Sequence, residues 1–219
     1  MSLRQPLFPV ALEVGGRECL VVGAGPVANR KAEALLGSGA VVTVVAPDVD
    51  QSMLALAQGP VGTAGGSLQI EQRPYRAGEA AEYRLVITST GIPEVDGAVF
   101  ADAEAAQVWV NSADDVEHCT FILPAVHRDG VVSIAISTGG ASPALASWLR
   151  RRMGEALEAG LGTMAAILEE ARLALKADGR STEGAAWPAL LDGPFPELVR
   201  QGRFSEARAM VEEVIGVRL

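Results

Sequence analysis

The chain has 219 residues, of which 49% are hydrophobic and 21% charged, a composition typical of a soluble globular protein with a packed core. Its formal net charge of −9 argues against a general affinity for nucleic acid or an anionic membrane, because both surfaces repel an acidic protein. No stretch reaches the roughly 18 apolar residues of a membrane span, and the interrupted apolar start is unlike a signal peptide. Cys19 and Cys119 form no disulfide or metal-binding pattern, so we expect a cytoplasmic protein.

The first half of the chain alternates short apolar runs with segments of helical spacing. An apolar run at 19–22 enters a glycine turn, and apolar residues then recur at helical spacing through 26–36. The β-branched run 41–45 is apolar on both faces, as a buried parallel strand is. This alternation predicts a Rossmann-like parallel-sheet domain over residues 1–113. Its other expected elements are helices at 50–58 and 93–107, an edge strand at 67–75, and strands at 83–90 and 108–114.

The pattern changes after Asn111. The stretch "TFILPAVHRDGVVSIAIS" contains two apolar runs joined at Gly130, which predicts a β-hairpin whose turn requires a positive φ. We therefore expect a small antiparallel segment over 114–141. A two-stranded hairpin is marginally stable alone, so a second subunit is expected to cover it.

The last part of the chain, residues 142–219, is expected to be a helical domain, which completes an α/β fold class. Ser142 as N-cap and Pro143 at the first helical position predict a helix that runs to about Ala159. Further helices are expected at 162–177 and 204–217. The Gly/Pro-rich stretch between them predicts an irregular connection.

The stretch "VVGAGPVANRKA", residues 21–32, nearly matches the dinucleotide fingerprint. Gly23 permits the tight turn, Gly25 lets a pyrophosphate approach the backbone, and the N–H groups that open the helix favour an anion. Ala28 replaces the third glycine, which serves mainly helix packing, so alanine is acceptable there. A merely structural turn is the alternative, but the strand, turn and helix context favours dinucleotide binding.

The residue that would hold the ribose is Asp48, twenty positions after Ala28, although Pro47 intervenes. The equally weighted alternative is that Asp48 is the N-cap of the next helix. No arginine directly follows the strand to receive a 2′-phosphate, so NAD is favoured over NADP.

Several separated motifs, taken together, carry a resemblance: the glycine turn, "NRKAEALLGSGAVVTVVAP", "VNSADD", "TFILPA" and "ISTGGASPALASWLRRR". Over roughly residues 5–155 the sequence resembles the precorrin-2 dehydrogenase family, which includes the amino-terminal module of siroheme synthase. The resemblance implies a homodimer that oxidises precorrin-2 to sirohydrochlorin with NAD. It leaves open a bifunctional enzyme that also inserts Fe²⁺ into sirohydrochlorin. A module that senses NAD(H) without chemistry is the alternative from another class.

The family's key carboxylate lies in an Asn-x-x-Asp pattern, here Asn111 and Asp114, so the resemblance implies that Asp114 is the catalytic base. A carboxylate just beyond a parallel strand lies where open α/β sheets bind ligands. The alternative is that Asp114 and Asp115 form a solvated capping pair. The expected cofactor residues are Gly23, Gly25, Pro26, Val27, Pro47, Asp48, Thr88 and Ser89.

Precorrin-2 carries many carboxylates, so it needs N–H or cationic partners. The "STGGASP" stretch leads into a helix whose first N–H groups are a natural carboxylate cradle, and Arg150 opens the densest basic cluster of the chain. His118 and His127 show no metal-ligand spacing, so no residue is assigned to a metal. The expected substrate-binding residues are Asn111, Thr138, Gly139, Ser142 and Arg150.

Overall fold

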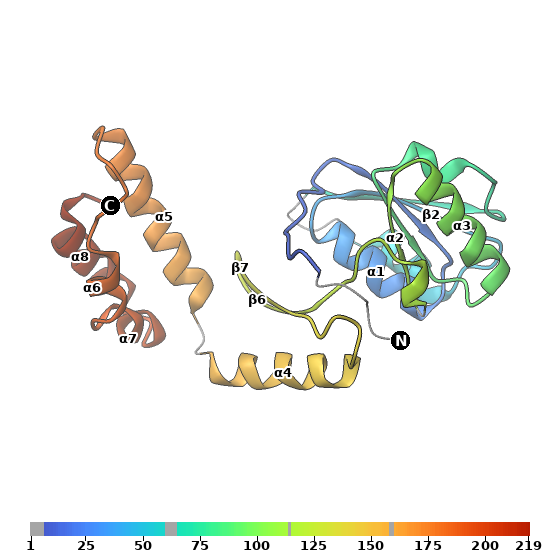
Figure 1. The fold of residues 1–219 in the computed structure, drawn as a ribbon. Coiled ribbons are helices and arrows are strands. Elements are labelled where there is room, and N and C mark those ends of the chain that lie inside the picture. Colours follow the sequence, from blue (N-terminus) through green and yellow to red (C-terminus); the bar gives the residue numbers. More distant parts are fainter. Residues whose placement is uncertain (1–6, 60–64, 114, 158–159) are drawn as a thin grey trace. The chain divides into compact units, whose positions relative to one another are not determined.

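A computed structural model of the protein describes residues 7–59, 65–113, 115–157 and 160–219 (Figure 1). The chain divides into two compact units. The first comprises the chain as far as Leu123 together with Gly139–Ala141, and the second comprises Pro124–Thr138 and Ser142–Leu219. Each unit is described by itself.

The first unit is built on a five-stranded parallel sheet in the order β3-β2-β1-β4-β5. The central strands are buried on both faces, which explains their continuous apolar sequence, whereas the edge strand β3 alternates between exposed and half-buried residues. The strands are β1 (Glu18–Val22), β2 (Val41–Ala46), β3 (Ser67–Gln72), β4 (Leu85–Thr88) and β5 (Trp109–Ser112).

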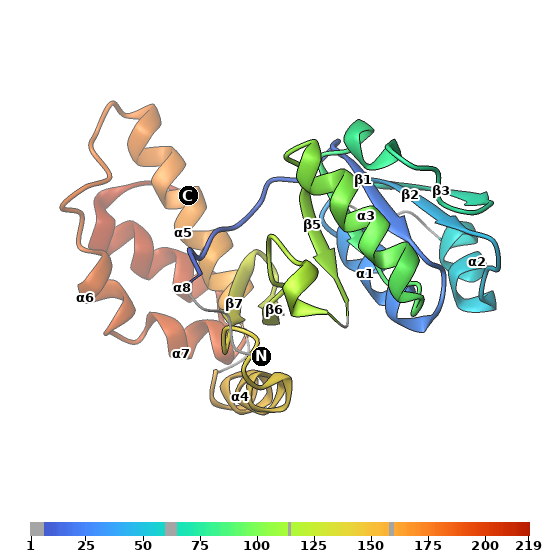
Figure 2. The same cartoon turned by 45° about the vertical axis from the view of Figure 1, so that its right-hand side comes forward.

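Helices cover both faces of this sheet (Figure 2). Val21 of β1 belongs to the core beneath α1 (Pro26–Leu36) and α2 (Gln51–Gln58). The next residue, Val22, belongs to the core beneath α3 (Pro93–Ala105), because successive strand side chains point to opposite faces. Two short 3₁₀ turns also occur in this unit, η1 (Glu79–Glu82) and η2 (Val116–His118).

The strand order reverses between β1 and β4. From β1 the chain moves outward through β2 to β3, then returns to β4 on the other side and continues to β5. The loops that follow β1 and β4 therefore lie side by side at the carboxyl edge of the sheet. In open α/β sheets this switch point is where ligands bind.

The second unit begins with the expected hairpin of β6 (Ala125–Asp129) and β7 (Val132–Ile136), with Gly130 at φ 57° in the turn. Helix α4 (Pro143–Ala156) packs against β6 so closely that a Cβ on Gly154 would lie 2.8 Å from Nδ1 of His127. Helix α4 of the same chain thus covers part of the hairpin. The sequence analysis had predicted that a second subunit covers it.

The remaining helices form a separate core around Phe195, which is fully buried. The prediction of an irregular connection at 178–196 was wrong in part. One short helix lies within this stretch, at Trp187–Leu191, and a second begins in it, at Phe195. Their prolines, Pro188 and Pro196, lie in the first turn of a helix, where no N–H is needed, and burial of neighbouring apolar residues favours the helices. The helices are α5 (Leu161–Ala177), α6 (Trp187–Leu191), α7 (Phe195–Arg200) and α8 (Phe204–Val211), followed by the π-helical turn η3 (Glu212–Gly216).

Two helix ends differ from the sequence prediction. Helix α4 ends at Ala156, and Leu157 is extended with ψ 120°, while the expected end at Ala159 lies outside the described residues. The last predicted helix is α-helical only to Val211. Among the helices that the structure describes, none combines the length and the apolar character needed to cross a bilayer.

Candidate active site

The turn after β1 leaves no room for a side chain at Gly23. This residue has φ 107°, and a Cβ built on it would lie 2.4 Å from the carbonyl oxygen of Ser89. The backbone after β1 therefore packs directly against the loop after β4. Only glycine satisfies both the positive φ and the close approach.

The next glycine faces open space. Gly25 is the N-cap of α1, and a Cβ built on it would meet no atom within 4 Å. No side chain caps this helix, and its first turn, which begins with Pro26 and Val27, contains no acidic residue. The N–H groups of the first turn can therefore bind an anion, so the turn fits a dinucleotide pyrophosphate.

Ala28 is fully buried in the core between α1 and the sheet, together with Ala32. The third position of the fingerprint thus serves packing in this chain, as the sequence predicted. The methyl group of alanine fits in this core, so alanine is compatible with the third position of the motif. A larger side chain would push α1 away from β1.

Pro47 and Asp48 follow β2 directly, and both are exposed. The N-cap of α2 is Asp50, whose Oδ1 accepts a hydrogen bond of 2.8 Å from the backbone N–H of Ser52, so the alternative role of Asp48 as this cap is wrong. The Asp50 N–H donates to the carbonyl of Ala24 at 3.2 Å. This bond ties the loop that carries Asp48 to the glycine turn.

The end of β4 is held by a carboxylate that the sequence analysis missed. Thr88 is fully buried and its hydroxyl donates to Asp96 of α3, while the hydroxyl of Thr90 donates to the same oxygen at 2.9 Å. The Thr88 hydroxyl therefore holds α3, whereas the backbone of Ser89 lines the glycine turn. The available signal was an acidic residue in the first turn of a helix that begins at Pro93, where the helix dipole favours negative charge.

The loop after β5 is anchored at both ends. Asn111 is 6% exposed, and its side-chain amide donates to the carbonyl of Phe121 at 3.0 Å. The Ala113 N–H donates to the carbonyl of Thr88 at 2.9 Å. Asp114, the expected base, lies outside the described residues. The structure therefore shows Asn111 in a holding role in this loop.

Asp115 caps η2 and its carboxylate is hydrogen-bonded to the ring of His118. Its carboxylate accepts a hydrogen bond from the Glu117 N–H at 3.0 Å and lies 2.7 Å from Nδ1 of His118. The hydrogen bond with His118 is the main reason that the pKa of Asp115 lies below its ordinary value. The His118 ring also packs on Phe100 of α3, with 4.9 Å between ring centroids. The capping role considered for this acidic pair is thus observed at Asp115.

Two consecutive glycines with positive φ follow the hairpin, Gly139 at 61° and Gly140 at 80°. They group with the first unit, where a Cβ on Gly140 would lie 3.5 Å from Cγ1 of Val116. That distance is ordinary van der Waals contact, so the positive φ is the reason that glycine is favoured at both positions.

The other expected substrate residues belong to the second unit. The Ser142 hydroxyl accepts a hydrogen bond of 3.2 Å from the Leu145 N–H, which confirms the predicted N-cap. The Thr138 hydroxyl accepts one of 3.1 Å from the Ser142 N–H. Arg150 is exposed on α4, whereas Arg152 pairs with Glu155 at 3.5 Å.

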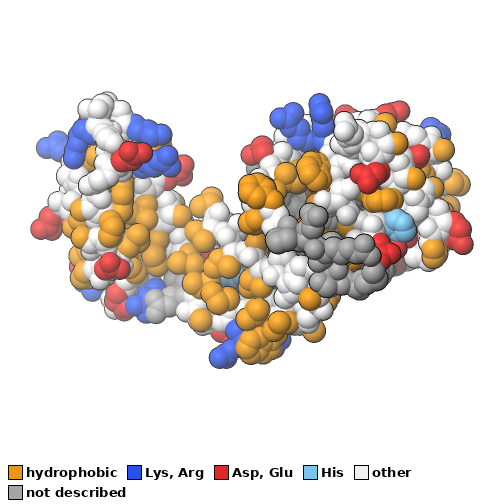
Figure 3. All heavy atoms as spheres, in the orientation of Figure 1, with side chains coloured by type: hydrophobic (Ala, Val, Ile, Leu, Met, Phe, Trp, Pro, Cys, Tyr) orange, Lys and Arg blue, Asp and Glu red, His pale blue; other side chains and the backbone are white. Residues whose placement is uncertain are grey.

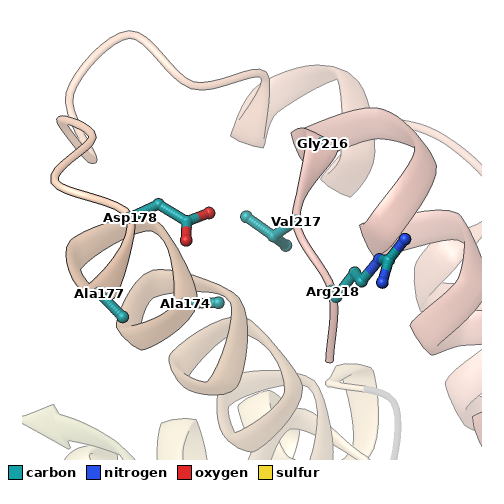
Figure 4. A pocket seen from close by; sticks show the side chains of 6 residues that line it. All are labelled: Ala174, Ala177, Asp178, Gly216, Val217 and Arg218. Atoms are coloured by element: carbon teal, nitrogen blue, oxygen red, sulfur yellow. The ribbon is translucent and has the colours of Figure 1, made fainter.

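The described residues contain no group of three or more His, Cys, Asp or Glu side chains placed to hold a metal ion. Two hollows lie away from the glycine turn. One of about 770 Å³ lies at the amino ends of the strands and includes Arg17, Arg84 and Trp109 in its lining. The other, of about 610 Å³, lies where the end of α5 approaches the chain terminus, and Asp178 and Arg218 are among its lining residues (Figure 4).

Two models of known protein families match the sequence of this chain. The model described as "Putative NAD(P)-binding" matches residues 10–125, and the one described as "Sirohaem biosynthesis protein central" matches residues 129–156. The solved structure of "SirC, precorrin-2 dehydrogenase" has a TM-score of 0.70 and 22% sequence identity, and the match covers 95% of this chain and 98% of that one. The expected fold class is thereby confirmed.

Curated relatives resemble the chain along nearly its whole length. The siroheme synthase of Acinetobacter baylyi is 32% identical over 209 residues, that of Chromobacterium violaceum 35% over 210, and that of Hydrogenovibrio crunogenus 36% over 216. These matches cover 94%, 95% and 94% of this chain but 45%, 43% and 43% of the relatives, so the chain spans less than half of their length. With more than half of its residues matched by the first family model, and with the glycine turn shaped as described, the chain belongs to the NAD(P)-binding family.

Proposed function

We propose that the protein oxidises precorrin-2 to sirohydrochlorin with NAD as the hydride acceptor. The observation that carries this proposal is the open N-terminus of α1 at Gly25, in a chain that matches siroheme synthases over about 94% of its length. The turn supplies the cofactor site, and the relatives supply the class of substrate. The likeness to a solved precorrin-2 dehydrogenase structure is consistent with both.

The residues around the turn favour NAD over NADP. Asp48 is exposed directly after β2, where a carboxylate accepts a hydrogen bond from the ribose 2′-hydroxyl and repels a 2′-phosphate. Arg73, which follows the neighbouring strand β3, has its guanidinium engaged by Glu71 and Glu79, each at 2.6 Å. No basic residue occurs at 47–50.

The chain has to accept a proton during this reaction. Dehydrogenation removes a hydride and a proton from the substrate, and NAD supplies the site that takes the hydride. We propose that the Asp114 carboxylate takes the proton, in keeping with its place in the loop after β5. The described residues on either side of Asp114 are held in place, because the Ala113 N–H donates to the Thr88 carbonyl and Asp115 caps η2.

We further propose that the substrate's carboxylates are bound by the segment around Gly139 and by the start of α4, with Arg150 as the cationic partner. The hydroxyls of Thr138 and Ser142 are engaged with backbone N–H groups. Their contribution to binding is therefore to shape the cradle. Asn111 is likewise proposed to be near the substrate while its amide holds the loop.

A homodimer in the cytoplasm is the proposed state of the protein. Hydrophobic side chains gather on the surface of the second unit (Figure 3). On this unit Val131 at the hairpin turn is 80% exposed, and Leu145 and Trp148 of α4 are each 47% exposed. Exposed apolar groups of this size favour a protein partner, and a second copy fits the resemblance.

The test is to mix purified protein, precorrin-2 and NAD and to follow NADH absorbance together with the tetrapyrrole spectrum. We expect NADH and sirohydrochlorin to form together, and we expect Asp114→Ala to bind NAD normally and turn over slowly. A variant that turns over as fast as the parent contradicts the role of Asp114. Adding sirohydrochlorin and Fe²⁺ without NAD tests the bifunctional alternative, and NAD binding without any turnover supports the sensing module.

A further inference from the structure

The sulfur of Cys119 lies inside the loop that follows β5. The backbone N–H of Ser112 donates to it at 3.2 Å, and the side-chain amide of Asn111 donates to it at 3.4 Å. The thiol in turn reaches the carbonyl oxygens of Asp115 at 3.2 Å and of Ser112 at 3.3 Å. One side chain therefore contacts both Ser112, which ends β5, and Asp115, which caps η2.

These contacts satisfy polar groups that water cannot easily reach. Ser112 is 5% exposed and Asn111 is 6% exposed, so a buried N–H at either position requires an acceptor. Burial raises the pKa of the Cys119 thiol, so it keeps the proton that it donates. A sulfur atom is a weak donor and acceptor, but here it accepts from two N–H groups while its single proton is shared between two carbonyl oxygens.

Neighbouring bonds hold the same loop on the outer edge of β5. Asn111 and Cys119 form an antiparallel bridge, and the Thr120 hydroxyl accepts a hydrogen bond of 2.8 Å from the Val110 N–H. The His118 ring rests on Phe100. Asp114 is flanked in sequence by residues that take part in these contacts.

We propose that Cys119 is a positioning residue whose thiol, together with the Asn111 amide, fixes Ser112 and Asp115, the described residues on either side of the proposed base Asp114. This inference rests on the proposed function, because it assigns Asp114 the role of proton acceptor. Cys119 itself does not touch the reacting atoms. Misplacing a reacting group by about 1 Å costs on the order of 100-fold in rate, which is how a loosened loop would act on catalysis.

The first test needs neither substrate nor cofactor. The protein is treated with iodoacetamide and the alkylation of each cysteine is followed by mass spectrometry, with the fully buried Cys19 as the internal control. We expect slow modification of Cys119 in the parent and modification faster by about tenfold in Asn111→Ala, because opening of the loop exposes the thiol. Glu117→Gln is the matched control on the same loop, since no hydrogen bond of the Glu117 carboxylate is found among the described residues, and it should leave the rate unchanged. A parent Cys119 that reacts as fast as a free thiol overturns the proposal.

The second test compares Cys119→Ala, Cys119→Ser and Glu117→Gln in the precorrin-2 assay. We expect Cys119→Ala to lower kcat by about 10- to 100-fold with the KM for NAD unchanged, because the loop and not the cofactor turn is affected. Serine keeps a donor and an acceptor, so Cys119→Ser should recover most of kcat, and Glu117→Gln should match the parent. Normal NAD binding shows that each variant is folded.

The outcomes separate the two proposals. If the parent and Cys119→Ala turn over equally fast while Asp114→Ala is inactive, the positioning role is wrong and the proposed function stands. Equal losses in the alanine and serine variants also overturn it, because the hydrogen bonds would then not matter. If the parent does not oxidise precorrin-2 at all, the proposed function fails, and the catalytic role of Cys119 fails with it. The alkylation test still decides whether the Cys119 thiol holds the loop.

Discussion

A Cβ on Gly23 would lie 2.4 Å from the carbonyl oxygen of Ser89, so the turn after β1 and the loop after β4 touch through backbone alone. Gly25, two residues later, would place its Cβ in open space. The two glycines of the fingerprint therefore differ in kind. The fold itself requires Gly23, whereas it leaves room for a side chain at Gly25, which is the space that the proposed dinucleotide would use.

Gly23→Ala should damage both folding and binding. The residue has φ 107°, and the added methyl group would collide with backbone that cannot move aside. Strain of this kind costs roughly 1–3 kcal/mol, before the clash is counted. Thermal denaturation should show a lower Tm, and NADH fluorescence titration should show weaker binding. A variant with the parent's Tm would contradict the packing described at this turn.

Gly25→Ala is the matched partner and should separate the two effects. Its φ of −81° suits alanine, so the free energy of unfolding should change by less than about 1 kcal/mol. The methyl group would occupy space that the pyrophosphate needs, so affinity for NAD should fall by about tenfold or more. Calorimetric titration measures the affinity. Unchanged NAD affinity would show that the dinucleotide does not bind at this turn.

Asp48→Ala should narrow the preference for NAD over NADP. Loss of a hydrogen bond to a charged group costs about 1.5–3 kcal/mol, so NAD affinity should drop by about tenfold or more while NADP binding improves. Asp50→Ala is the control, because Asp50 caps α2 through Ser52. That variant should lose about 1 kcal/mol of stability and keep the parent's ratio of affinities. An unchanged ratio in Asp48→Ala would place the ribose elsewhere.

The pKa of Asp115 should rise toward its ordinary value in His118→Ala, because the hydrogen bond with His118 is the main cause of its lowering. The ionised carboxylate stabilises the loop after β5 fully above the ordinary pKa of about 3.9. That contribution is lost as the pH falls through the lowered folded-state value. Carboxyl ¹³C NMR titration measures it, with Asp50 as the internal control, whose pKa is lowered mainly by the side chain of Ser52. A pKa of Asp115 that stays low in the variant would refute the pairing.

Phe195→Ala should destabilise the second unit without weakening NAD binding. Phe195 is fully buried in the helical core, and removal of such a side chain costs about 3–5 kcal/mol. Phe204→Ala is the control, because Phe204 is 43% exposed and should lose much less. Chemical denaturation measures the stability of both variants. A loss of NAD affinity in Phe195→Ala would show that the cofactor turn depends on this core.

Regular periodicity made most of the first unit predictable from the sequence. The β-branched runs of β2 and β4 are buried on both faces, and such runs have few alternatives to a parallel sheet. The cap of α2 was assigned to Asp48 as an equal alternative, but Asp50 fills it. Two aspartates two positions apart give the same local signal, and the hydrogen bond that the Asp50 carboxylate accepts from the Ser52 N–H identifies the cap in the structure.

Residues whose roles depend on distant partners were not predictable. Asp96 holds Thr88 and Thr90, and Asn111 holds Phe121, across loops whose shape the sequence does not specify. The short helix α6 was missed for a similar reason, since glycine and proline dominate its surroundings and burial of Leu190 decides the conformation.

The bridge between Asn111 and Cys119 also seals the outer side of β5, which is an edge strand of the sheet. An uncovered edge invites another chain to extend the sheet. The segment that follows β5 thus also keeps this edge from pairing with the sheet of another molecule, so its hydrogen bonds should matter for solubility as well as for the proposed reaction.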